Sequence, residues 1–176
     1  MVGLSKGIFA HRYIQKFRYV KNTEFFSQEI ALYCSPDKSH AQMLLDKSEH
    51  NFKAFLLLKE HKYLTPCVHC GYYSCFQKVV YILENYFPDE YRQISEARRN
   101  RSKGNLHKEC IEEFVHQFRK RANAGSAKKL HDFLIELKSY RIEADYNSEP
   151  VTSDRIEEVG LIVEEFRRLV KTNLHI

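Results

Sequence analysis

Apolar side chains recur every three or four residues over most of this chain, and this spacing constrains the fold more than any other feature. The stripes run through residues 41–56, 68–86, 107–118, 130–144 and 156–170. This period matches one face of an α-helix, whereas a half-buried strand would alternate every second residue. Only six Gly and four Pro are present, too few for a turn-dense all-β fold. The sequence therefore predicts an all-α fold, an up-and-down bundle of four to five long helices.

Helix starts are predicted where a capping residue precedes an apolar stripe. The pairs concerned are Ser39 with Gln42, Thr65 with Pro66, and Asp154 with Glu157. Gly125 fits a helix stop, and the polar, basic residues 88–104 are expected to break at Gly104. The N-terminal residues have no clear period. We therefore predict an N-terminal extension over residues 1–36 and the helical bundle over residues 37–176.

Composition and the N-terminus bear on where the protein acts. No stretch approaches the roughly 20 apolar residues that span a bilayer, and no signal peptide is recognisable. The five cysteines are an odd number without a signal, which suggests reduced thiols. We therefore expect a cytoplasmic protein with no membrane contact. The net charge of +5 permits an anionic partner such as RNA but does not require one.

Three stretches, taken in order, carry a resemblance to a known family. Residues 41–63 (AQMLLDKSEHNFKAFLLLKEHKY) come first, and residues 70–87 (CGYYSCFQKVVYILENYF) follow with many aromatic side chains. Residues 140–147 (YRIEADYN) then precede an amphipathic C-terminal stretch. This order resembles the HEPN family, small helical domains of prokaryotic toxin–antitoxin, defence and nucleotidyltransferase-associated proteins. The resemblance covers about residues 40–172.

The family's catalytic signature is an arginine followed, after four to six residues, by a histidine. In this sequence the resemblance assigns it to Arg101 and His107, with Arg99 as the stand-in for Arg101. It implies an endoribonuclease that needs no metal and no cofactor, in which the 2′-OH of RNA attacks the adjacent phosphate. It also implies a homodimer whose two Arg/His pairs line one cleft, with an antitoxin or a nucleotidyltransferase as a partner.

The residue types suit that chemistry. Histidine exchanges a proton near neutral pH, and the arginine fork matches two phosphate oxygens. On one unbroken helix, however, six residues turn the chain by about 600°, which leaves Arg101 and His107 roughly 120° apart. The two side chains therefore meet only if the helix bends, for example at Gly104, or if two subunits each supply one of them.

Basic and amide side chains around His107 are candidate RNA contacts. They are Arg98, Arg99, Asn100, Lys103, Asn105 and Lys108. Such a run binds phosphates without reading the base sequence, and it is equally typical of a solvated surface. His107 itself begins an apolar stripe, so the alternative for it is a core histidine hydrogen-bonded to a neighbouring carbonyl.

Two further motifs have mainly structural interpretations. Residues 65–75 contain Cys67, His69, Cys70 and Cys75, but the second ligand pair of a structural zinc site is missing. We therefore predict no metal site and expect thiols that pack between helices. Arg141 and Asp145 lie four residues apart, so they are expected to form an ion pair, with Tyr146 packed at the helix end.

Three functions remain open on the sequence. The first is the HEPN-type ribonuclease. The second is a catalytically inactive module of the same fold that binds RNA or a nucleotide and assists a partner. The third is a helical oligomerisation domain.

Overall fold

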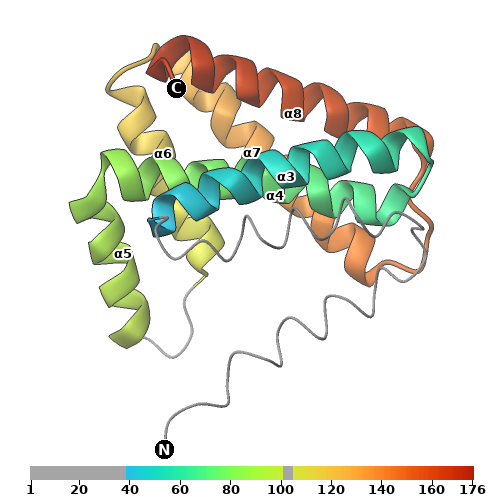
Figure 1. Cartoon of the computed structure of the whole chain (residues 1–176), viewed down its shortest axis with the longest axis horizontal. Helices are drawn as coiled ribbons and strands as arrows, with labels where there is room; N and C mark the ends of the chain where they lie inside the picture. The colour runs from blue at the N-terminus through green and yellow to red at the C-terminus, as the bar shows by residue number, and fades with distance from the viewer. Residues whose placement is uncertain (1–38, 101–104) are drawn as a thin grey trace, which may run out of the picture. The chain divides into compact units, whose positions relative to one another are not determined.

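The computed structural model describes residues 39–100 and 105–176, and the residues before Ser39 and between Asn100 and Asn105 lie outside it. The described residues form six helices and no strand (Figure 1). The helices are α3 (His40–Glu60), α4 (Leu64–Tyr86), α5 (Pro88–Asn100), α6 (Leu106–Arg119), α7 (Ala124–Tyr146) and α8 (Ser153–Leu174). The predicted all-α bundle is therefore confirmed. The predicted extension over residues 1–36 lies outside the described residues.

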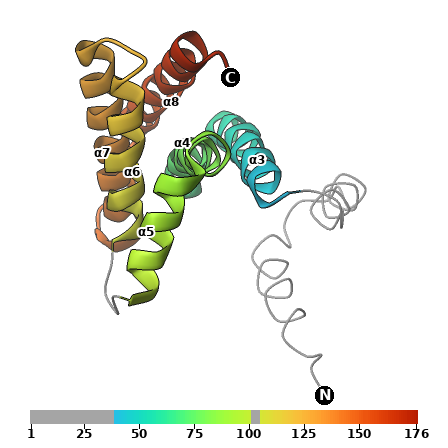
Figure 2. The ribbon, with the colours of Figure 1, turned by 90° about the vertical axis from the view of Figure 1, so that its left-hand side faces the viewer.

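Helix α4 is the centre of the bundle. It packs against α3 on one side and against α6, α7 and α8 on the other (Figure 2). Its stripe is buried at Val68, Tyr72, Cys75, Val79 and Leu83. Because α4 has neighbours on nearly all sides, a large apolar surface is removed from water, and this burial is the main stabilising term of the fold.

The other stripes also face the core, with two exceptions at their ends. Leu56 is 44% exposed and Tyr86 is 40% exposed, although both belong to predicted stripes. Each lies in the last two turns of its helix. The stripes of α6 and α8 are buried as predicted.

Two predicted helix starts and one predicted stop are wrong. Helix α4 begins at Leu64, so Thr65 and Pro66 lie inside its first turn, where the missing N–H of proline costs no hydrogen bond. Helix α8 is capped by Thr152 instead of Asp154, because the Thr152 hydroxyl accepts from the Arg155 N–H at 3.3 Å. Gly125 does not stop a helix. It lies in the first turn of α7, which is capped by Asn123.

Helix α5 is an element that the apolar pattern did not predict. It begins at Pro88, and Asp89 and Glu90 lie in its first turn, where carboxylates are favoured by the helix dipole. Among the α5 side chains that are described, residues 88–96, Tyr91 and Ile94 pack partly against the core. Helix α5 is described as far as Asn100 and α6 begins at Leu106, and the predicted break at Gly104 lies outside the described residues.

Candidate functional site

His107 lies in the first turn of α6, two residues after the capping residue Asn105. The turn is fixed by Asn105, whose side-chain oxygen accepts a hydrogen bond from the Lys108 N–H at 3.2 Å. His107 as a whole residue is partly buried, and its ring packs against aromatic side chains of α4.

Aromatic side chains of α4 hold the His107 ring. It stacks on Phe76 with a centroid separation of 4.0 Å and an interplanar angle of 9°. Tyr73 meets it edge-on at 6.2 Å. The hydroxyl of the buried Tyr72 forms a hydrogen bond with His107 Nδ1. Stacking and hydrogen bonding together fix the orientation of the ring.

The hydroxyl of Tyr72 suits a histidine that changes its protonation state. Burial raises the pKa of Tyr72, so the phenol stays neutral at physiological pH. Its oxygen can accept a hydrogen bond from Nδ1–H in the neutral Nδ1–H tautomer and equally in the imidazolium. The hydrogen bond at Nδ1 therefore survives a proton gain or loss at Nε2.

Helix α7 brings a cation to the beginning of α6. Lys138 Nζ donates to Asn105 Oδ1 at 3.2 Å. The Asn105 oxygen thus serves the helix cap and this lysine at once. The positive end of the α6 dipole and the Lys138 ammonium together make this end of α6 favourable for an anion.

A second polar cluster lies between α4 and α7. Asp145 Oδ1 is 2.9 Å from His69 Nε2, and Asp145 Oδ2 is 3.1 Å from Arg141 Nη2. The predicted Arg141–Asp145 ion pair is thus confirmed. The predicted packing of Tyr146 is wrong, because this side chain is 78% exposed beyond the last buried turn of α7.

Several predicted site residues lie outside the described part of the chain. Arg101 and Lys103 belong to the undescribed residues 101–104. Arg98, Arg99 and Asn100 end α5, and their side chains are not described. Lys108 is described: it is exposed, and its Nζ lies 3.6 Å from Glu112.

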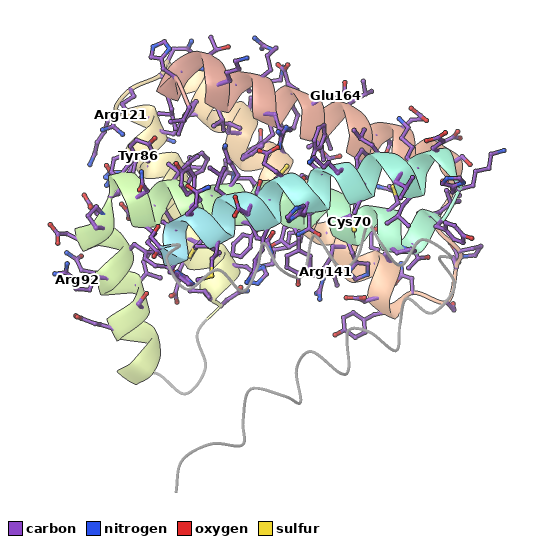
Figure 3. The ribbon with its side chains drawn as sticks, viewed as in Figure 1. Cys70, Tyr86, Arg92, Arg121, Arg141 and Glu164 are labelled. Atoms are coloured by element: carbon purple, nitrogen blue, oxygen red, sulfur yellow. The ribbon has the colours of Figure 1, made fainter. Side chains whose placement is uncertain are left out.

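A second basic stretch, residues 118–129, lies at the opposite end of α6 from His107, where α6 ends and α7 begins. Figure 3 shows Arg121 of that stretch well apart from Arg141. Arg121 covers the Phe87 ring at 4.5 Å, and Lys129 pairs with Glu165 at 2.8 Å. These two cations of the stretch are thus engaged at the end of α6 far from His107.

The cysteines of α4 pack in the core. Cys67 and Cys75 are fully buried, and burial raises the pKa of each thiol to about 12. Cys70 is half-buried, and burial raises its pKa to about 11. Over residues 39–100 and 105–176, no three His, Cys, Asp or Glu side chains gather in a way that would hold a metal ion.

The comparisons with known proteins returned no similarity: no family model matches the chain, and no curated protein and no solved structure matches it. Within the described residues, no helix is both long enough and apolar enough to cross a membrane.

Sequence reasoning did not find the partners of His107. Tyr72 and Phe76 stand on the core stripe of α4, at least 31 residues away along the chain, and nothing local marks them as neighbours of a histidine. Lys138 and the pairing of His69 with Asp145 were missed for the same reason.

Proposed function

We propose that the protein is a metal-independent endoribonuclease in which His107 exchanges protons with RNA. The observation that carries this proposal is the partly buried His107 in the first turn of α6, whose imidazole is held at Nδ1 by the hydroxyl of buried Tyr72. A fixed, partly exposed histidine near basic side chains is the usual arrangement of a general acid or base.

The proposed reaction uses the RNA's own nucleophile. The 2′-oxygen attacks the adjacent phosphorus and loses its proton, while the bond from phosphorus to the 5′-oxygen of the next nucleotide breaks. That leaving oxygen takes up a proton. The products are a 2′,3′-cyclic phosphate and a 5′-OH end. Because Nδ1 is engaged by Tyr72, His107 would use Nε2 to take or give the proton.

Cations would bind the phosphate during this reaction. Arg101 is the proposed partner of His107, with Arg99 as its stand-in, and the remaining basic residues would hold the RNA backbone on either side. The positive end of α6 and the Lys138 ammonium support an anion at this place. Asn105 already serves as helix cap, so its amide nitrogen is the atom proposed to contact phosphate or sugar.

The proposal includes a homodimer. The resemblance to HEPN proteins implies that Arg101 and His107 of two subunits line one cleft, and that the protein works as a toxin or defence ribonuclease beside an antitoxin or nucleotidyltransferase.

The test is cleavage of single-stranded and structured RNA by the purified protein in EDTA, with analysis of the product ends. Metal-independent cleavage that leaves cyclic phosphate and 5′-OH ends is the expected result. RNA binding without cleavage would favour the inactive accessory module instead. If the protein neither binds nor cleaves RNA, a helical oligomerisation domain is the interpretation that remains.

A further inference from the structure

One donor of Arg141 lacks an acceptor. Its Nε is buried and, among the described residues, it has no hydrogen-bond partner. A buried N–H without a partner is costly, and native proteins rarely leave one. The unmet donor therefore requires an explanation.

The contacts of Asp145 explain why the Nε–H of Arg141 has no acceptor. A carboxylate placed side-on would accept from Nε and Nη2 together. Asp145 cannot do so here, because its Oδ1 is engaged by His69 at 2.9 Å and only Oδ2 reaches Nη2, at 3.1 Å. Of the two donors on this side of the guanidinium, Nη2 therefore has an acceptor and Nε has none.

Arg141 also lies close to the His107 site. Burial raises the pKa of Tyr72, and the positive charge of Arg141 is near enough to oppose that rise. Lys138, one turn earlier on α7, contacts Asn105 at the beginning of α6. Lys138 and Arg141 therefore form a cationic face of α7 beside Tyr72 and His107.

We propose that Arg141 binds a phosphate of the RNA backbone through the Nε–Nη2 face of its guanidinium. This inference rests on the proposed function, since it assigns a contact to the RNA that reaches His107. The Arg141 side chain is 28% exposed, so a modest rotation presents Nε to the phosphate. Asp145 then gives up Nη2 and keeps its contact with His69 Nε2.

Binding is measured with a single-stranded RNA that carries 2′-O-methyl groups on every sugar. This RNA lacks the attacking hydroxyl, so affinity is observed without turnover. Arg141→Gln is expected to weaken binding about 10-fold and to reduce the slope of log affinity against log salt by about 0.7, the value for one phosphate contact on a single strand. Arg141→Lys is expected to be intermediate, because lysine keeps the charge but lacks the fork.

Asp145→Asn separates this role from a structural one. Removing the competing carboxylate is expected to tighten binding severalfold, whereas a merely structural ion pair would predict loss of affinity or no change. Arg119→Gln is the charge-matched control, because Arg119 is exposed in the last turn of α6, away from the site. It is expected to change affinity less than twofold. Thermal unfolding of each variant verifies the fold.

Three results would overturn the inference. They are a loss in Arg141→Gln no larger than that in Arg119→Gln, weaker or unchanged binding by Asp145→Asn, and no binding of the oligonucleotide by the wild type. Failure of the proposed function looks different. In that case unmodified RNA is not cleaved, while binding still depends on Arg141.

Discussion

At His107, each neighbouring side chain has a separate effect on the imidazole. Phe76 covers one face of the ring, which shields that face from water and keeps the ring plane fixed. The Tyr72 hydroxyl fixes the rotation of the ring within that plane. The Nε2 edge of the ring is the part that a substrate would meet.

Tyr72→Phe tests the hydroxyl at the residue scale. The substitution keeps the buried ring and removes only the hydrogen bond to Nδ1. Such a bond contributes about 1 kcal/mol, so we expect the cleavage rate to fall roughly fivefold while the fold is retained. Single-turnover RNA cleavage measures the effect. Tyr63→Phe, at a 62% exposed tyrosine, is the control. Equal rates for wild type and Tyr72→Phe would contradict the assigned role.

At the element scale, α4 approaches α3 and α8 closely at one glycine. A Cβ at Gly71 would lie 2.7 Å from Val159 Cγ1 and 3.3 Å from Phe55 Cδ2. Both neighbours are buried core side chains, so neither can move away freely. A Cβ at Gly160 of α8 would instead meet the flexible end of Lys59, at 3.2 Å.

Substitution of these two glycines by alanine is therefore expected to affect stability differently. Gly71→Ala is expected to lower the free energy of unfolding by about 1–2 kcal/mol, because overpacking outweighs the helix propensity of alanine. Gly160→Ala is expected to be neutral or to stabilise by up to about 1 kcal/mol. Urea denaturation measures both. A Gly71→Ala protein as stable as wild type would contradict the close packing of α4 against α8.

A polar contact between α7 and α8 predicts a dependence on pH. Hydrogen bonds from Arg168 and Lys129 lower the pKa of Glu165 to about 2, from an ordinary value of 4.5. Because the folded-state pKa is lowered, the carboxylate stabilises the fold above pH 4.5, and this contribution is lost as the pH falls toward 2.

Glu165→Gln should therefore be less stable than wild type at pH 7, by less than about 1 kcal/mol because the partners are exposed. The difference should disappear as the pH falls from 4.5 toward 2. Urea unfolding across this pH range measures it. If the difference in unfolding free energy between wild type and Glu165→Gln stays constant with pH, the ion pairs of Glu165 are not its cause.

The apolar spacing predicts helices well and their ends poorly, for a physical reason. Burial depends on the whole stripe, so the stripes of α4, α6 and α8 identify those helices. An end depends on which single side chain accepts an N–H, and Thr152 and Asp154 are both suitable caps by type. Over residues 88–96, helix α5 turns Tyr91 and Ile94 toward the core, too few apolar side chains to give a stripe.

At the scale of the whole molecule, the candidate site was only partly predictable. His107 was found because arginine and histidine stand at a spacing that resembles a catalytic signature. Its partners Tyr72 and Phe76 come from another helix, and a contact between helices depends on how they pack, which the local sequence does not encode. For the same reason, Arg141 was predicted as an ion-pair partner alone.

The shared cleft of the proposed homodimer predicts complementation between inactive variants. Arg101→Ala and His107→Ala subunits, unfolded together and refolded, form mixed dimers in which one site regains both residues. About one quarter of the wild-type activity is expected, since half of the dimers are mixed and each has one intact site. Light scattering verifies the dimer. No recovery of activity would place Arg101 and His107 of each site in the same subunit.

The most direct test of the central claim compares two histidines of the same helix. His107 lies in the first turn of α6, and His116 is exposed in its last turn. The measurement is the rate of RNA cleavage in EDTA by His107→Ala and by His116→Ala. We predict that His107→Ala loses activity at least about 100-fold, as expected for a general acid or base, while His116→Ala cleaves like wild type. Wild-type cleavage by His107→Ala would contradict the account.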